Sequence, residues 1–297
     1  MIYQFIKDYN SKRWTIEVMC KVLSVTRSAY YNWLKDPIGK RRRKGMELDE
    51  KIKKAYFLAK GRNGSPRLAK DLQMAETAVS RPTVARHMKQ LGLRSKLSKR
   101  FRITTDSTHD YKVAPNLLNR DFYREKPVEA CVPDLTYIPC LDGVLYLTVV
   151  LDLFDRKPIG WSMSDKMSAS NTVLPAIRMA NRNRPFSEGM IFHSDRGVQY
   201  ACKKTRNVLN DLKVQQSMSR KGNCWDNAVA ESFFKSFKSE LIYGTKLRIK
   251  EEMSLYVFEY IESWYNHRRR FSALNNLTID EFWVQYWIRK EPIMNVA

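Results

Sequence analysis

The sequence lacks a hydrophobic run long enough to cross a membrane. The longest apolar run, residues 144–154, falls short of the roughly 20 residues that a membrane-spanning helix needs and is interrupted by Asp152. Residues 1–8 also lack the basic-then-apolar order of a signal peptide. We therefore expect a protein without a membrane partner that works in the cytoplasm.

Cysteine is scarce, and no C-x-x-C pair occurs. The five cysteines are odd in number and scattered, which excludes a disulfide framework and a zinc module and indicates a reducing cytoplasm; they are Cys20, Cys131, Cys140, Cys202 and Cys224. Internal repeats and low-complexity tracts are absent as well.

Acidic residues are in the minority. The 31 Asp and Glu face 53 Lys and Arg, a formal net charge of +22. Such an excess implies a polyanionic partner, and nucleic acid is the leading choice. With 297 residues of which 43% are hydrophobic, the chain is long and apolar enough for a sizeable core and more than one domain.

The first part of the chain is typical of small helical units. Residues 1–36 read as a helix-turn-helix with its turn at 24–26, although a plain helical hairpin fits the pattern equally well. Residues 37–60 are predicted to be a basic linker and a helix. The charge run 40–44 is expected to be a solvated segment that grips phosphates.

A second helix-turn-helix is predicted for residues 61–103. Ser80 caps its second helix, which stops at Gly92. The exposed side of that helix carries groups that suit contacts with base edges and phosphates, namely Arg81, Thr83, Arg86 and Lys89. A basic tail (94–102) leads to a polar linker, for which we expect the bounds 104–125.

The hydrophobic period changes after residue 125. Residues 126–245 predict the order β-β-β-α-β-α-β-α, an α/β fold in which three antiparallel strands are followed by parallel crossovers, with helices on both faces of a mixed sheet. The strands are expected at 131–139, 144–153, 159–164, 190–194 and 214–218. Residues 246–297 are predicted to form a helical, aromatic-rich C-terminal region.

Three acids are expected to converge on this sheet. Asp134 lies on the first strand, Asp195 follows the fourth, and Glu231 lies on the polar stripe of an amphipathic helix at 222–238. The first and fourth strands are neighbours in this topology. Alone, Glu231 reads as a surface partner of Lys235. Together, the three carboxylates suit two Mg²⁺ or Mn²⁺ ions, which can activate a nucleophile and stabilise a leaving oxygen in phosphoryl transfer.

The helix that carries Glu231 has two distinct faces. Asn227, Lys235 and Lys238 share its polar stripe, and we expect the two lysines to contact the DNA backbone. Phe233 and Phe237 lie on the opposite face and are expected to lock the helix onto the sheet.

Other candidates have competing structural interpretations. His193 is as compatible with packing as with lining the site, and Gly197 with a simple turn as with backbone room near DNA. Arg269, in the basic run 268–270, is expected to hold either DNA or a partner subunit. Asp152 is expected to form a structural ion pair with Arg156.

Four segments resemble the integrase-core transposases of bacterial insertion sequences, specifically the second-reading-frame product of two-frame elements. They are 134–138, 150–154, 193–200 and 219–231, and the last is very specific. Residues 265–266, 269 and 272–274 look like the C-terminal motif of that family. The resemblance implies a ribonuclease-H-like core in which Asp134, Asp195 and Glu231 bind two divalent metal ions.

The resemblance also implies the reaction and the partners. In that family water frees a 3′-hydroxyl at the element end, the hydroxyl attacks a second phosphodiester, and a circular intermediate is typical. Double-stranded DNA (element ends and target), a homo-oligomer and an upstream-frame product or fusion are the implied partners. The sequence departs from the family pattern at Cys131, Pro133, Phe271 and Ile279.

Three alternatives remain at this stage. One is a sequence-specific DNA-binding protein whose nuclease core has decayed, and another is a structure-specific nuclease without transposition. A retroviral-type integrase is disfavoured, because no His-His-Cys-Cys zinc cluster can be assembled from His87 and the scattered cysteines.

Overall fold

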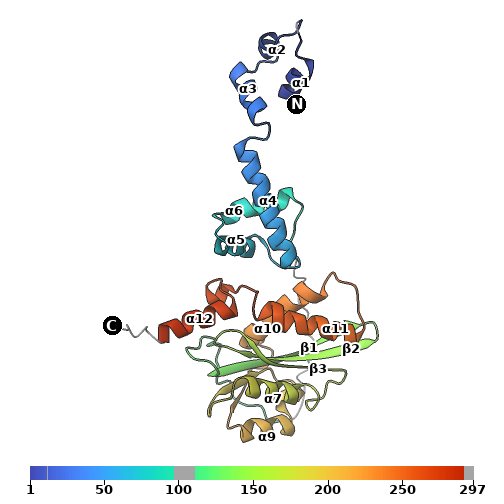
Figure 1. Cartoon of the computed structure of the whole chain (residues 1–297). Coiled ribbons are helices and arrows are strands. Elements are labelled where there is room, and N and C mark those ends of the chain that lie inside the picture. Colours follow the sequence, from blue (N-terminus) through green and yellow to red (C-terminus); the bar gives the residue numbers. More distant parts are fainter. Residues whose placement is uncertain (12, 97–110, 291–297) are drawn as a thin grey trace, which may run out of the picture. The chain divides into compact units, whose positions relative to one another are not determined.

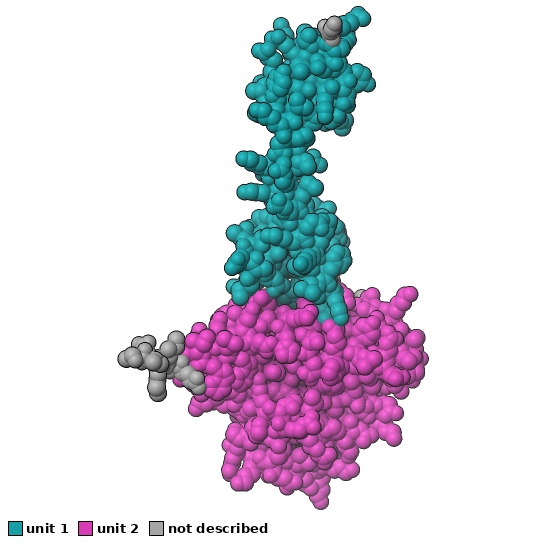
Figure 2. All heavy atoms as spheres, in the orientation of Figure 1, with its two compact units in different colours: residues 1–95 teal, residues 96–297 magenta. Residues whose placement is uncertain are grey.

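The computed structural model describes residues 1–11, 13–96 and 111–290. The chain divides into two compact units, 1–95 and 96–297 (Figure 2). Most of the predicted basic tail and the start of the predicted polar linker fall in 97–110, outside the described residues. Across the described ranges, no helix has both the length and the apolar character that crossing a membrane requires.

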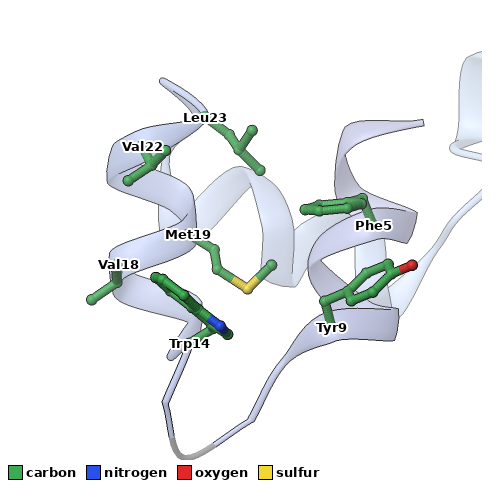
Figure 3. A pocket seen from close by; sticks show the side chains of 7 residues that line it. All are labelled: Phe5, Tyr9, Trp14, Val18, Met19, Val22 and Leu23. Carbon is green, nitrogen blue, oxygen red and sulfur yellow. The ribbon is translucent and has the colours of Figure 1, made fainter.

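The first helices of unit 1 form a small module, α1 (Ile2–Tyr9), α2 (Ile16–Val22) and α3 (Arg27–Lys35). The side chain of Thr15 caps α2, and that of Thr26 accepts the backbone N–H of Ala29 to cap α3, as the predicted helix-turn-helix requires. An apolar groove lies between α1 and α2 (Figure 3), lined by Phe5, Tyr9, Trp14, Val18, Met19, Val22 and Leu23.

The remaining helices of unit 1 are α4 (Lys40–Leu58), α5 (Ser65–Met74) and α6 (Arg81–Gln90). The basic run 40–44 begins α4, since Lys and Arg are good helix formers and only residues 36–39 are non-helical here. Ser80 caps α6 by accepting the N–H of Thr83. The three helices enclose one core that includes Ile52, Leu68 and Val84.

Unit 2 contains a five-stranded sheet with the order β3-β2-β1-β4-β5 (Figure 1). The strands are β1 (Ala130–Cys140), β2 (Gly143–Asp152), β3 (Pro158–Ser164), β4 (Ile191–Ser194) and β5 (Gln215–Met218). β1, β2 and β3 are antiparallel, whereas β4 runs parallel to β1 and β5 parallel to β4. The predicted mixed sheet, with its first and fourth strands adjacent, is confirmed.

Helices cover both faces of the sheet (Figure 1). On one side lie α7 (Val173–Asn183) and α9 (Lys203–Asp211), and on the other α10 (Ala228–Phe237) and α11 (Lys250–Phe258). α7 packs so closely on β3 that a Cβ added at Gly160 would lie 2.3 Å from the carbonyl oxygen of Ala176. Glycine at this position is therefore a packing requirement.

Shorter elements connect these helices. They are α8 (Val198–Ala201), the 3₁₀ turn η1 (Cys224–Asn227), the wide helical turns η2 (Lys238–Ile242) and η3 (Glu259–Tyr265), the 3₁₀ turn η4 (Ser272–Leu274) and the last helix α12 (Ile279–Lys290). The helix predicted for 222–238 is thus two elements, η1 followed by α10.

The apolar face of α10 has further partners besides the sheet on which we expected it to pack. α10 lies along β1, but the ring of Phe233 packs 4.7 Å from that of Tyr265, and the ring of Phe237 lies 5.3 Å from that of Tyr260. The aromatic anchors therefore contact the C-terminal element η3. The helical, aromatic C-terminal region forms a layer over the helix that carries Glu231.

Candidate active site

The two aspartates lie where β1 and β4 separate. β1 pairs with β4 only at Ala130 and Cys131, whereas its antiparallel pairing with β2 continues past Asp134, which faces Val149. Asp195 directly follows the last residue of β4. Pro133 lies beyond the short pairing with β4, so it interrupts no ladder on that side.

Asp134, Asp195 and Glu231 form one electrostatic cluster. The pKa of Asp134 is raised well above its ordinary value by burial first, and then by the negative charges of Asp195 and Glu231. The backbone N–H of Leu135, which donates to Asp134 Oδ1 at 2.8 Å, lowers that pKa in part. Burial also raises the pKa of Glu231. The charges of Asp195 and Glu231, from two separate elements, thus lie close enough to oppose the ionisation of Asp134.

Gly197 holds Asp195 in place. Its backbone N–H donates to Asp195 Oδ1 at 2.9 Å. A Cβ at Gly197 would lie 3.0 Å from the same oxygen and 3.2 Å from Gln199 Oε1, so a side chain would crowd the carboxylate. The backbone φ of Gly197 is −59°, which any residue can adopt. Glycine is therefore required here for the space beside the carboxylate and not for its backbone conformation.

Of the two lysines on the polar stripe, Lys238 lies nearer to the acids. Its ammonium is 5.3 Å from the ring centroid of Tyr137, and its charge lowers the pKa of Asp134. Burial lowers the pKa of Lys238 itself, and Asp134 opposes that effect. Lys235 is exposed, and Asn227 is buried one turn before Glu231, where its Oδ1 has no hydrogen-bond partner.

His193 is fully buried, and both of its ring nitrogens are hydrogen-bonded to groups outside the acid cluster. Its Nδ1 lies 2.8 Å from Ser217 Oγ, and its Nε2 lies 3.0 Å from the carbonyl oxygen of Asp226. Burial lowers its pKa, so the neutral imidazole is favoured. This placement favours the packing interpretation: His193 ties β4 to the turn that leads into α10.

Asp226, in the 3₁₀ turn η1, is buried and accepts hydrogen bonds from several residues, so we call it the Asp226 hub. Arg220 donates to it from its backbone N–H and from its guanidinium at 2.7–2.9 Å, and Arg120 Nε donates at 2.8 Å. These hydrogen bonds, those of Arg220 first, hold the pKa of Asp226 far below its usual range. The hub fixes η1 just before α10. The sequence did not indicate it, because Arg120 is 106 residues away.

Two local predictions are corrected by long-range partners. Asp152 forms its ion pair with Arg184, 2.6 Å away, and not with Arg156, which donates to the carbonyl oxygen of Phe122. Arg269 is buried against Glu240, with Nε 3.3 Å from the carboxylate. An interior ion pair of this kind does not leave the guanidinium available to DNA.

In unit 1 the residues selected on α6 mostly face solvent. Arg81, Arg86 and Lys89 are exposed. Thr83 is half-buried, and its hydroxyl lies 3.0 Å from that of the capping Ser80. The three exposed cations form a basic face on the second helix of this helix-turn-helix.

The departures from the family pattern are mainly interior positions. Cys131, Phe271 and Ile279 are all buried, and Phe271 packs 5.0 Å from Tyr265. They fill the hydrophobic interior, while the three acids remain intact.

The chemistry of the acid cluster suits hard divalent cations. Its donors are carboxylate oxygens, and their mutual repulsion would be relieved by a positive ion. In the part of the chain that the structure describes, no three His, Cys, Asp or Glu side chains are already grouped so as to hold a metal ion. The cluster is therefore an assembly of candidate ligands and not a finished chelate.

Comparison with known families defines the class first. Two family models described as "Integrase core domain" match residues 124–224 and 212–278, and one described as "HTH-like domain" matches residues 43–101. The chain is an integrase-core protein preceded by an HTH-like DNA-binding domain, and the fold class expected from the sequence is confirmed.

Relatives then define the family. "Transposase InsF for insertion sequence IS3A" of Escherichia coli is 38% identical over 284 residues, which cover 95% of this chain and 98% of the relative. "Insertion element IS600 uncharacterized 31 kDa protein" of Shigella sonnei is 37% identical over 268 residues, covering 90% and 98%. The chain belongs to the InsF family of insertion-sequence transposases. Among solved structures, the catalytic domain of Mos1 mariner transposase shares 13% identity at a TM-score of 0.41, over 54% of this chain and 76% of that one.

Proposed function

We propose that the protein is a metal-dependent DNA transposase that cleaves the ends of an insertion sequence and joins them to target DNA. The observation that carries this proposal is the electrostatic cluster of Asp134, Asp195 and Glu231 at the point where β1 and β4 separate. Acids placed on separate elements of a sheet and opposing one another's ionisation are typical of sites built to bind cations or to handle protons.

The three carboxylates would hold two Mg²⁺ or Mn²⁺ ions, in line with the oxygen-only donor set. When bound, such ions activate a nucleophile and stabilise the leaving oxygen of a phosphodiester. The residues themselves have separable tasks. Gly197 orients Asp195 through its N–H, and the Asp226 hub fixes the turn from which α10 presents Glu231.

The DNA-contact proposal rests on charge and exposure. Arg81, Arg86 and Lys89 on α6 would read or grip the element end, and Lys238 beside Asp134 would contact a phosphate next to the reacting one. Lys235, near the end of α10 and three residues before Lys238, is exposed and would contact the DNA backbone as well. We do not retain Arg269 as a DNA contact, because it is buried against Glu240. Two DNA ends must meet in one complex, so a homo-oligomer belongs to the proposal, as does joint action with an upstream-frame product.

An end-cleavage and strand-transfer assay on the element's own termini tests the proposal. Asp134→Asn and Glu231→Gln should abolish Mg²⁺- or Mn²⁺-dependent products and largely spare DNA binding. Asp165→Asn is the matched control, because it removes an exposed aspartate after β3 that has no part in the cluster. The reactions are run with and without the upstream product.

The outcomes separate the competing functions. A wild type that binds the termini but yields neither cleavage nor joining with either metal would favour a DNA-binding protein with a decayed core. Cleavage that ignores the terminal sequence and gives no joined product would favour a structure-specific nuclease.

A further inference from the structure

Tyr200 is a buried tyrosine next to the acid cluster that the proposed mechanism does not use. It lies on α8, directly after the Asp195–Gly197 turn, and is 2% exposed. Its ring belongs to the core cluster that includes Cys131 and Phe192, one residue from each of the two paired strands. The ring is thus part of the core to which both of these strands contribute.

The hydroxyl of Tyr200 has no hydrogen-bond partner, although it is shielded from water. A buried hydroxyl without a partner costs on the order of 1–3 kcal/mol. Phenylalanine would fill the same space without that cost. An uncompensated hydroxyl in a native core calls for a partner that arrives in another state of the protein.

The surroundings of the hydroxyl indicate which partner that is. A Cβ at Gly197 would lie 3.0 Å from Asp195 Oδ1 and 3.6 Å from Cδ2 of Tyr200, so the carboxylate and the ring flank the same small space. Besides burial, the charges of Asp134 and Asp195 raise the pKa of Tyr200, so both carboxylates act on the phenol. The ring that carries the unpartnered donor therefore borders the carboxylate of Asp195, which can only accept hydrogen bonds when it is ionised.

We propose that Tyr200 is a positioning residue for the metal site: its hydroxyl donates to a carboxylate oxygen of Asp195 when that carboxylate turns to bind a divalent cation. The hydrogen bond fixes which oxygen faces the ion and supplies the buried donor with its partner. This inference rests on the proposed function, because it assumes that Asp195 binds a metal. Outer-shell partners of this kind typically contribute 10–100-fold to metal affinity.

The test is Tyr200→Phe in the full-length protein, which removes the hydroxyl and keeps the ring. Mn²⁺ is titrated calorimetrically into the protein, alone and with a duplex of the element's end. Thermal unfolding is followed with and without Mn²⁺. We expect Mn²⁺ binding that is about 10–100-fold weaker, together with an unchanged or higher Tm of the metal-free protein.

Tyr260→Phe is the matched control. Tyr260 is equally buried, but its hydroxyl already donates to Glu240 Oε2 at 3.1 Å. This variant should lower the metal-free Tm and leave Mn²⁺ affinity unchanged. Asp134→Asn supplies the baseline without the metal site.

The results distinguish failure of this inference from failure of the proposed function. If wild type and Tyr200→Phe bind Mn²⁺ equally and Asp134→Asn does not bind it, the role of Tyr200 is wrong and the metal site stands. If Tyr200→Phe lowers the metal-free Tm and leaves Mn²⁺ affinity as Tyr260→Phe does, the hydroxyl is merely structural. If wild type shows no binding that depends on Asp134, both proposals fail.

Discussion

Replacing Arg269 by alanine should destabilise unit 2 and leave DNA contacts intact. The guanidinium Nε lies 3.3 Å from Glu240 Oε1, and Nη2 donates to Ser236 Oγ at 2.6 Å. Both charged side chains are less than a tenth exposed. Removing one partner of a buried pair typically costs about 3–5 kcal/mol, because the other charge stays buried. For a unit of this size, that corresponds to a fall in Tm of about 6–20 °C.

The measurement is thermal unfolding of the full chain, paired with DNA binding over a range of salt concentrations. Arg268→Ala is the matched control, because Arg268 is the exposed neighbour in the same basic run. We expect this control to change the free energy of unfolding by less than about 0.5 kcal/mol, as surface substitutions do. If Arg268 touches a phosphate, the slope of log affinity against log salt should fall by about one in that variant only.

The opposite pattern would refute this reasoning. An Arg269→Ala protein that melts like wild type but loses DNA affinity and one unit of salt slope would mean that Arg269 is a DNA contact, as its sequence position first indicated.

Four further variants test other parts of the structure. Asp134→Asn should abolish cleavage and raise the metal-free Tm at pH 7–8, because burial and neighbouring charges raise the pKa of the wild-type carboxyl. The wild type loses stability as the pH rises above about 4 and this carboxyl ionises. The variant should partly retain that stability, which thermal melts from pH 4 to 8 will measure. Gly160→Ala should lower the free energy of unfolding, measured in urea, by about 3 kcal/mol or more, because its Cβ would overlap the α7 backbone. Gly45→Ala in α4 is its control: the added Cβ would meet nothing within 4 Å, so the free energy of unfolding should rise by about 0.5–1 kcal/mol. Asp226→Asn should lower the free energy of unfolding by an amount on the order of 1–3 kcal/mol at pH 7. The hydrogen bonds from Arg220 depress the pKa of Asp226. The difference in stability between wild type and variant should therefore shrink as the pH falls below about 4 and the wild-type carboxylate loses its advantage.

The sheet and the meeting of the acids were predictable because both follow from short-range patterns. Strand periodicity and the order of the elements make the first and fourth strands neighbours, and they place Asp134 and Asp195 near each other before any contact is known. Local capping rules predicted the cap at Ser80 equally well.

Partners that are distant in the sequence were not predictable in this way. Asp152 has Arg156 four residues away, yet the backbone of Arg156 takes a positive φ of 64° and its side chain turns to Phe122. Arg184, 32 residues away, fills the place instead. In the same manner, the basic run 268–270 has the composition of a solvated face, and only the fold reveals that Arg269 has a buried carboxylate to neutralise.

The position of Glu231 depends on the same kind of distant contact. An amphipathic helix beside a sheet is expected to bury its apolar face on the sheet, and α10 does lie along β1. Its Phe233 and Phe237 also pack on Tyr265 and Tyr260 of the C-terminal layer, contacts that the helical pattern alone does not predict. The boundary proposed between residues 245 and 246 therefore passes through one packed layer, and the compact unit 96–297 spans it. Since the buried Glu240–Arg269 pair joins the two sides of that boundary, the C-terminal helices hold α10, and with it the third acid, in place beside β1.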